Sequence, residues 1–250
     1  MNKRLDVILT EKGLAKSRTA AQALIKEGSV SVNGRTVSKP SEMFDDERDE
    51  FSVAEDSALT KYVGRGGLKL ETAVGHFGID LNGAVCLDIG ASTGGFTDCM
   101  LQNGAARVYA VDVGTSQLDG RLRSDSRVIS LEKLDIRDAD ESVIPEKVNF
   151  ISIDVSFISL RQILPVIGRF AAEDARCVAL IKPQFELGRK KLGKNGVVTD
   201  PKLREKVKAE IVGFTESLGC RVIGVIPSAI AGGDGNIEYL MYFTVFNGER

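Results

Sequence analysis

The chain has 250 residues, of which 43% are hydrophobic and 27% charged, and its net charge is −2. This size suits one medium domain with a small appendage, and the charge excludes a uniformly basic nucleic-acid binder. No apolar run has the length of a secretion signal or a membrane span, and the one histidine, His76, leaves no room for a multi-histidine metal site. We expect His76 at the surface or at a helix end. The cysteines lack metal-ligand or redox spacing, so we expect buried free thiols in a reducing, cytoplasmic setting at Cys86, Cys99, Cys177 and Cys220.

The first sixty residues have the pattern of a separate small unit. Apolar positions at helical spacing predict one helix within residues 4–13 and a second within 18–28, with Ser17 as its N-cap and Gly28 at its end. Residues 29–38 place valines on both sides of Asn33-Gly34, which predicts a β-hairpin. A helix pair followed by a hairpin is the shape of a compact RNA-binding module.

Charge is distributed unevenly along this unit. Basic residues outnumber acidic ones up to Pro40, whereas residues 41–56 are strongly acidic. Residues 3–56, and above all the segment SRTAAQALIKEGSVSVNGRTVSKPS, resemble the S4 domain, a small α+β RNA-binding fold. The resemblance implies phosphate contacts, which position RNA without reading its sequence, by Arg4, Lys16, Ser17, Arg18 and Lys26. The alternative is a basic helix face that contacts only solvent.

Residues 59–68 are predicted to link an S4-like domain at 1–58 to a larger domain at 69–250. Gly64, Gly66 and Gly67 favour a flexible or tightly turned joint, and a helix is expected to begin nearby. The joint is also basic, and we expect RNA contacts from Arg65 and Lys69.

From Gly83 onward, apolar segments alternate with amphipathic ones. Strands are predicted at residues 84–90, 107–114, 127–133, 149–157, 175–183, 220–228 and 238–246, and helices at 95–104, 159–173 and 200–219. This alternation predicts an α/β domain with a parallel, doubly wound sheet. No helix separates the last two strands, so we expect them to pair antiparallel. Seven strands with this ending are the plan of the Rossmann-like S-adenosylmethionine methyltransferases, and not of the dinucleotide-binding dehydrogenases.

The segment AVCLDIGASTGGFTDCML predicts a cofactor site, because a buried strand leads through a loop of small residues into a helix. Glycines let the chain turn tightly and let a ligand lie against bare backbone amides. Ser92 replaces the second glycine of a dinucleotide fingerprint. The segment resembles the first motif of S-adenosylmethionine methyltransferases, which implies contacts to the amino-acid part of that cofactor by Asp88, Gly90, Ala91, Ser92, Gly94, Gly95 and Phe96. A purely structural turn is the alternative.

Three more acidic positions follow predicted strands at the edge where ligands of open α/β sheets bind. Asp112 is suited to accept both ribose hydroxyls of the cofactor. Asp135, with Ile136 beside it, is suited to an adenine amino group and ring. Asp154 follows the fourth strand of the sheet. A turn or helix-cap carboxylate is the alternative for any one of them, but four in register favour a site.

Four residues at the predicted strand ends form a candidate catalytic group: Lys69, Asp154, Lys182 and Glu238. A Lys-Asp-Lys-Glu set in this order resembles the FtsJ/RrmJ-type 2′-O-ribose methyltransferases. Together with the S4-like unit and the motifs KYVGRGGLKLE and IKPQFE, the whole chain resembles the TlyA (hemolysin A) family. The resemblance implies 2′-O-methylation of ribosomal RNA, on cytidine in the small or large subunit, with S-adenosyl-L-methionine as cofactor and without a metal.

The resemblance also implies roles for the four residues. Lys182 is the candidate that activates the 2′-hydroxyl, Lys69 holds that hydroxyl or a neighbouring phosphate, and the two carboxylates orient the lysines. Nearby carboxylates favour a charged lysine whereas a second lysine favours a neutral one, so Lys182 acts either as a base or as an orienting group.

A basic Gly-rich loop follows, and we interpret it as a flap over the RNA, with Arg189, Lys190 and Lys191 in contact; an ordinary solvated loop is the alternative. Two other functions stay open. One is a ribosomal RNA-binding assembly factor without catalysis, and the other, opposed by the absence of a spanning segment, is a haemolysin. The sequence predicts neither the modified nucleotide nor the oligomeric state.

Overall fold

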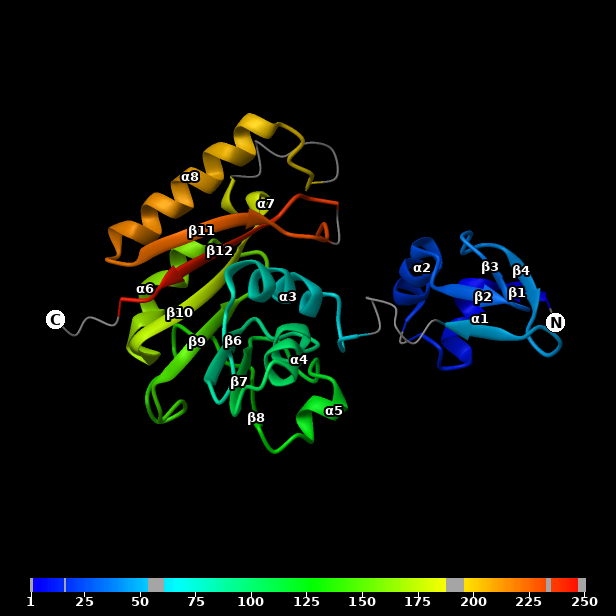
Figure 1. The fold of residues 1–250 in the computed structure, drawn as a ribbon, viewed down its shortest axis with the longest axis horizontal. Helices are drawn as coiled ribbons and strands as arrows, with labels where there is room; N and C mark the ends of the chain where they lie inside the picture. The colour runs from blue at the N-terminus through cyan, green and yellow to red at the C-terminus, as the bar shows by residue number, and fades with distance from the viewer. Residues whose placement is uncertain (1, 16, 54–60, 188–195, 233–234, 247–250) are drawn as a thin grey trace. The chain divides into compact units, whose positions relative to one another are not determined.

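The computed structural model describes residues 2–15, 17–53, 61–187, 196–232 and 235–246. The chain divides into two compact units, Met1–Lys61 and Tyr62–Arg250, each described here by itself (Figure 1). This division differs from the linker expected at 59–68. Tyr62 and Val63 are buried within the second unit, and the helix α3 already begins at Gly66, because this segment packs against the larger core.

The first unit contains both predicted helices and the predicted hairpin. Helix α1 spans Leu5–Glu11 and α2 spans Arg18–Glu27, while the hairpin consists of β2 (Val30–Val32) and β3 (Arg35–Thr36). The hydroxyl of Ser17 accepts a hydrogen bond from the backbone of Ala20, and Gly28 ends α2 in a left-handed conformation, as predicted. The apolar faces of these elements form a small core that includes Leu5, Leu9, Ile25 and Val30.

The acidic stretch after Pro40 contains two strands that were not predicted. Strand β4 (Met43–Asp45) pairs antiparallel with β1 (Asn2–Arg4), and β5 (Phe51–Val53) pairs antiparallel with β2. The rings of Phe44 and Phe51 meet edge to face and pack on the core, while the carboxylates of Asp45 and Asp49 accept backbone hydrogen bonds in the turn between the strands. Two aromatic anchors therefore outweigh the poor strand propensity of this segment.

The second unit is built on the predicted seven-stranded sheet, in the order β11-β12-β10-β9-β6-β7-β8. Five strands run parallel, and β12 is antiparallel to both of its neighbours, which confirms the predicted fold class and the antiparallel ending. The strands are β6 (Val85–Ile89), β7 (Arg107–Asp112), β8 (Val128–Glu132), β9 (Val148–Ile153), β10 (Ala171–Ile181), β11 (Arg221–Pro227) and β12 (Tyr239–Thr244).

Helices cover both faces of this sheet, as Figure 1 shows. One core cluster contains the apolar sides of α3 (Gly66–Phe77), α4 (Gly95–Gln102) and the one-turn α5 (Gly120–Arg123). The other contains those of α6 (Leu164–Ile167) and α8 (Pro201–Ser217). Two cores separated by one sheet are the arrangement of a doubly wound α/β domain.

The single helix predicted at 159–173 is wrong. The segment forms a 3₁₀ turn η1 (Leu160–Gln162), the one-turn α6, a second 3₁₀ turn η2 (Gly168–Phe170) and then the start of β10. Pro165 lacks the backbone N–H that a continuing helix needs, and Gly168 stands where α6 ends, so no long ladder of helical hydrogen bonds develops.

The predictions for histidine and cysteine are confirmed. His76 is exposed in the last turn of α3. All four cysteines are buried and unpaired. Burial raises the pKa of the Cys86 thiol to about 12, so this sulfur is inert at neutral pH.

Candidate functional site

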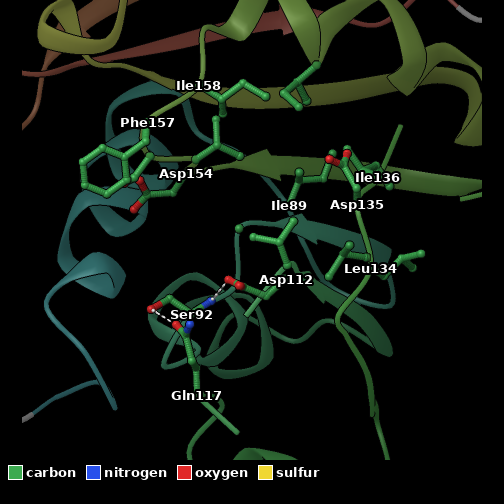
Figure 2. A pocket seen from close by; sticks show the side chains of 16 residues that line it. Ile89, Ser92, Asp112, Gln117, Leu134, Asp135, Ile136, Asp154, Phe157 and Ile158 are labelled. Carbon is green, nitrogen blue, oxygen red and sulfur yellow. Dashed lines mark hydrogen bonds between the residues drawn. The ribbon is translucent and has the colours of Figure 1, made fainter. Parts of the chain in front are cut away.

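A cavity of about 320 Å³ opens at the carboxyl ends of β6, β7 and β9 (Figure 2). Its walls are largely apolar, and its polar groups come from the loops that leave the strands. Six residues expected to bind a cofactor line it: Gly90, Ser92, Asp112, Asp135, Ile136 and Asp154. A second cavity shares some of these residues and extends toward α3, with Gly66, Ala91, Gly95, Phe96 and Lys182 in its wall. The sheet therefore brings most of the predicted cofactor residues to one place.

The turn after β6 needs glycine because another strand end passes very close. A Cβ at Gly90, whose φ is +85°, would lie 2.5 Å from the backbone oxygen of Asp154. Ser92 is also left-handed, with φ +48°, and its backbone N–H donates to Oδ2 of Asp112 over 2.7 Å. The turn is thus held open, with bare backbone facing the cavities.

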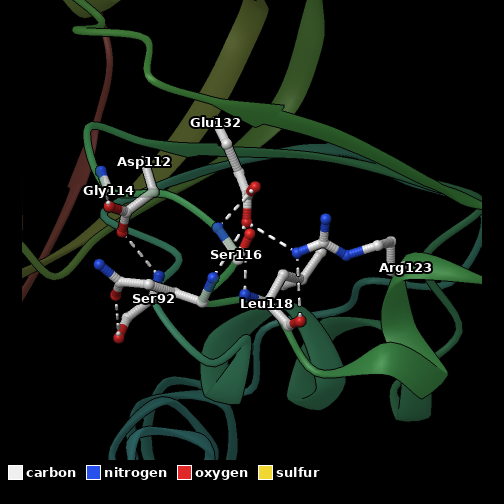
Figure 3. Close-up of polar contacts among 8 residues, drawn as sticks. Ser92, Asp112, Gly114, Ser116, Leu118, Arg123 and Glu132 are labelled. Carbon is white, nitrogen blue, oxygen red and sulfur yellow. Dashed lines mark hydrogen bonds and ion pairs between the residues drawn. The ribbon is translucent and has the colours of Figure 1, made fainter.

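Asp112 organises this turn as well as lining the cavity. Its second oxygen, Oδ1, accepts from the backbone N–H of Gly114 over 2.7 Å, so each carboxylate oxygen already has one internal donor (Figure 3). A carboxylate accepts about four hydrogen bonds, and lone pairs on both oxygens remain for a ligand. The geometry fits two ribose hydroxyls.

Glu132, at the end of β8, holds the next loop and was missed by sequence reasoning. Its carboxylate accepts from the backbone N–H groups of Ser116 and Gln117 and from the guanidinium of Arg123, at 2.9, 3.1 and 2.9 Å (Figure 3). The Ser116 N–H contributes most to lowering the pKa of Glu132. Gln117, fixed in this way, lines the cavity and contacts the hydroxyl of Ser92. An acid at a strand end was the available signal for Glu132, but its partners are backbone groups that no side-chain motif reveals.

Asp135 lies in the cavity wall with a partner of its own. Its carboxylate forms a two-point contact with the guanidinium of Arg137, at 2.9 and 2.6 Å, and this interaction is the main cause of its lowered pKa. Ile136 beside it is buried and contributes to the apolar wall together with Leu134. An apolar slot with one polar carboxylate at its rim fits a flat heterocycle.

Asp88 and Gly94, which the resemblance also assigned to the cofactor, do not line either cavity. Asp88 is fully buried and accepts hydrogen bonds from the hydroxyls of Thr97 and Ser152, at 2.6 and 2.8 Å. Burial raises its pKa to about 6 in spite of these donors. Gly94, with φ +95°, leaves room for Leu122 against its backbone. Both residues support the turn from beneath, since their positions are enclosed by protein.

The four residues of the candidate catalytic group form two ion pairs. Nζ of Lys69 lies 2.6 Å from Oε2 of Glu238, and Nζ of Lys182 lies 2.5 Å from Oδ1 of Asp154. Lys182 also donates to the hydroxyl of Ser156 over 3.0 Å. Both lysines are less than a tenth exposed, which is rare for lysine unless it is paired.

The two ion pairs lie at the same edge of the sheet. Ile181 of β10 pairs with Tyr239 of β12, so Lys182 and Glu238 extend from neighbouring strands. Gln184, in the one-turn helix α7 (Pro183–Glu186), donates to Glu238 over 3.4 Å. On the other side, a Cβ at Gly66 would lie 3.9 Å from a carboxylate oxygen of Asp154. Helix α3, β9, β10 and β12 therefore bring two cations and two anions to this edge of the sheet, and one of the two pairs, Lys182–Asp154, lines the second cavity.

The segment before α3 packs tightly on the turn that forms the cavities. The ring of Tyr62 occupies the space where a Cβ of Gly67 would be, at 2.3 Å, and the backbone N–H of Val63 donates to Asp98 of α4. A Cβ at Gly95 would lie 2.8 Å from the backbone nitrogen of Gly67. This close contact between two glycine-rich segments fixes the start of α3, and it therefore also fixes the position of Lys69 in that helix.

The predicted RNA contacts of the first unit have a structural role that the sequence did not reveal. Arg4 and Arg18 both donate to the buried carboxylate of Asp6, and so does Gln22. Both guanidinium groups nevertheless stay partly exposed, so each retains N–H groups for a phosphate. Ser17 is occupied as the N-cap, Lys26 is exposed in the last turn of α2, and Arg65 is exposed at the N-cap of α3. Lys16 and the predicted flap residues Arg189, Lys190 and Lys191 lie outside the described residues.

In the described part of the chain, no helix has the length and apolar character that crossing a membrane requires. Across the same residues, no cluster of three or more His, Cys, Asp or Glu side chains is placed to hold a metal ion.

Comparison with known proteins identifies relatives for both units. Residues 62–245 match the model of the FtsJ-like methyltransferases, and residues 3–49 match that of the S4 domain. Hemolysin A of Brachyspira hyodysenteriae is 41% identical over 243 residues, which cover 97% of this chain and 100% of that protein. The 16S/23S rRNA (cytidine-2′-O)-methyltransferase TlyA of Mycobacterium tuberculosis is 41% identical over 239 residues, which cover 96% and 88%. A solved structure from Streptococcus thermophilus, provisionally named a hemolysin, is similar with a TM-score of 0.77 at 43% identity over 98% of this chain and 88% of that one.

Proposed function

Because this chain belongs to the FtsJ-like methyltransferases and carries an S4 domain at its N-terminus, we propose that it transfers a methyl group from S-adenosylmethionine to a ribose 2′-hydroxyl of ribosomal RNA. The observation that carries the proposal is the two buried lysines and their ion pairs: Lys182–Asp154 lines the second cavity, and Lys69–Glu238 lies at the same edge of the sheet. A protein that only binds RNA has no need to bury two lysines at the edge of a sheet.

The cavities have the donors and the shape that S-adenosylmethionine requires. Gly90, Ala91, Ser92, Gly95 and Phe96 would hold its amino-acid part, with Asp88 and Gly94 supporting the turn from below. Asp112 would accept the ribose hydroxyls, and Asp135 and Ile136 would face the adenine. When bound, this cofactor supplies a methyl group on a positively charged sulfur. Asp154, in the wall of both cavities, would favour that charge.

Lys182 would orient the attacking hydroxyl. A lysine ammonium has three N–H donors; one of those of Lys182 donates to the hydroxyl of Ser156, and the charge pairs with Asp154. Another donor would bind the 2′-oxygen, so that the hydroxyl is held in line with the methyl group. Lys69, fixed by Glu238, would hold the same hydroxyl or the adjacent phosphate.

Substitutions in one ion pair test the assignment. We expect Lys182→Ala and Asp154→Asn to lower methyl transfer from radiolabelled cofactor to ribosomal RNA about 100-fold or more, the range seen when a positioned proton-transfer or orienting group is lost. Lys206→Ala is the matched control, because Lys206 pairs with Glu210 on the exposed side of α8. Turnover near that of the wild type in both site variants would contradict the proposal.

The substrate class comes from the relatives, and we propose cytidine in small- or large-subunit ribosomal RNA. The S4 domain, with Arg4, Lys16, Ser17, Arg18 and Lys26, would bind the RNA backbone, joined by Arg65 and by Arg189, Lys190 and Lys191. Mapping 2′-O-methyl marks on ribosomal RNA from cells with and without this protein tests the class directly. An unchanged set of marks, with cofactor binding intact, would point to an assembly factor instead.

A further inference from the structure

Glu186 ends the turn α7, four residues after Lys182, and reaches across to a different loop. Its carboxylate accepts a hydrogen bond from the hydroxyl of Ser159 over 2.5 Å and one from the backbone N–H of Leu160 over 2.8 Å. The side chain is partly buried, and burial raises its pKa although both donors oppose that shift. Removing a carboxylate from water costs free energy. The hydrogen bonds of Glu186 to the neighbouring loop must offset that cost.

The loop that Glu186 holds forms one wall of the main cavity. It runs from Asp154, after β9, to Ser159, before η1, and the five consecutive residues 154–158 line the cavity. Both of its ends are bound to the same short segment of the chain. Asp154 pairs with Lys182, and Ser159 is bound to Glu186.

The middle of this loop has a conformation that must be imposed on it. Phe157 has φ +64°, which is unfavourable for a bulky residue, and its side chain is 91% exposed. Its ring contacts that of Phe185, with centroids 5.0 Å apart, between the two polar anchors. A strained backbone persists only when its surroundings determine it; the segment from Lys182 to Glu186 supplies contacts at both ends and in the middle of the loop, in addition to the hydrogen bond from Asp154 to Ile89.

We propose that Glu186 is a positioning residue that fixes the wall of the cofactor cavity from Asp154 to Ser159. This inference rests on the proposed function, since it assumes that the cavity binds S-adenosylmethionine. Segment 182–186 then has two tasks. Its first residue, Lys182, faces the reacting hydroxyl, and its last residue sets the loop that contacts the cofactor.

Cofactor affinity is the first test. We expect Glu186→Ala to weaken binding of S-adenosylmethionine about tenfold, measured by titration calorimetry without RNA, because two hydrogen bonds that order the loop are lost. Glu186→Gln should stay within about threefold of the wild type, because its amide can accept from Leu160 and donate to Ser159. Glu173→Ala, an exposed carboxylate at the opposite end of β10, is the control and should change nothing.

The order of the loop gives a second readout that needs neither cofactor nor RNA. The chain contains no tryptophan, so Phe157→Trp introduces a single fluorescent reporter in the loop. We expect lower steady-state anisotropy of this reporter when Glu186→Ala is added, and little change with Glu186→Gln. Ser159→Ala removes one of the two donors and should give a smaller decrease, which keeps the test available if Glu186→Ala folds poorly.

The two readouts separate the possible failures. Unchanged anisotropy and unchanged affinity in Glu186→Ala would overturn the positioning role, as would a Glu186→Gln variant as impaired as Glu186→Ala. If the wild type binds no S-adenosylmethionine, the proposed function fails on its own, and the anisotropy still decides whether Glu186 orders the loop.

Discussion

Among the described residues, each unit buries one aspartate completely, and the pKa values of the two carboxylates shift in opposite directions. In the first unit, Asp6 accepts hydrogen bonds from Arg4, Arg18 and Gln22, and its pKa is lowered far below the usual range, chiefly by Arg4. In the second unit, Asp88 has only hydroxyl and backbone donors, and burial raises its pKa to about 6. Neither side chain is exposed to solvent; the guanidinium groups beside Asp6 favour its charged form, whereas Asp88 has no cation beside it in the described part of the chain and burial favours its neutral form.

The difference follows from what each unit does with its cations. The first unit uses two arginines to neutralise a buried acid while part of each guanidinium stays exposed. The second unit keeps its buried cations, Lys69 and Lys182, at one edge of the sheet, paired with Glu238 and Asp154, and leaves Asp88 to neutral donors. The arginines of the first unit therefore stabilise a buried acid, whereas the buried lysines of the second unit belong to the candidate site.

The largest effect is expected when the buried carboxylate of the first unit, that of Asp6, is removed. Asp6→Ala should destabilise that unit by about 3 to 4 kcal/mol, because it removes the charged acceptor of four hydrogen bonds, for which water at the partly exposed guanidinium groups compensates only in part. A unit of about sixty residues has little stability in reserve. Hydrogen exchange measured by mass spectrometry on peptides from residues 2–53 should show loss of protection.

The second unit supplies the internal control for this change. All four tyrosines lie between Tyr62 and Tyr242, so tyrosine fluorescence reports the second unit alone and should not change in Asp6→Ala. Glu11→Ala, which removes an exposed partner of Lys3, is the matched control within the first unit. Retained protection in Asp6→Ala would show that the arginines do not need this acid.

The next effect concerns pH and Asp88. The ordinary pKa of an aspartate is near 3.8 and the folded value is about 6, so the folded protein keeps a proton that the unfolded chain releases. This contribution to stability is present below pH 3.8 and is lost as pH rises through 6. Relative to the wild type, Asp88→Asn should gain roughly 2 to 3 kcal/mol between pH 4 and 7. Urea unfolding followed by tyrosine fluorescence at several pH values measures it, and a constant difference would contradict the assignment.

Sequence patterns predicted the sheet well because its strands are continuous apolar runs between polar loops. The S4 and TlyA resemblances are likewise confirmed by the family and relative matches. The failures have physical causes. Strands β4 and β5 lie in an acidic stretch whose anchors are two phenylalanines, and the broken segment at 159–173 depends on Pro165 and Gly168, whose effect on a helix was underestimated.

Sequence could place the acids near the strand ends but not how deeply each is buried. Asp88 pairs with Ala110, two residues before Asp112, so both side chains leave the same face of the sheet. Asp88 precedes the last residue of β6 and is enclosed by the core, whereas Asp112 is the last residue of β7 and lines the cavity. Glu132 and Glu186 escaped notice because they bind backbone groups and a distant hydroxyl, and such contacts exist only after folding.

A smaller effect tests where the second unit begins. Gly67→Ala would place a Cβ against the Tyr62 ring, and we expect a loss of about 1 to 3 kcal/mol from overpacking, with methyl transfer impaired through Lys69. Gly75→Ala, in the same helix with open space around it, should stabilise by about 0.5 to 1 kcal/mol. Tyrosine-monitored unfolding should separate the two, and equal behaviour would mean that residues 62–67 belong to neither core.

The smallest effect sharpens the role of the arginines in the first unit. Arg18 gives Asp6 one hydrogen bond at 3.2 Å and is more exposed than Arg4, which gives two. Arg18→Ala should therefore leave protection of residues 2–53 nearly intact while lowering the slope of RNA affinity against salt concentration by about 1, as expected for one lost phosphate contact. Arg121→Ala, an exposed arginine of the second unit, is the control. If Arg18→Ala unfolds the first unit or leaves the salt slope unchanged, the guanidinium of Arg18 serves Asp6 and not RNA. The comparison of the two units then concerns only how each one buries its aspartate.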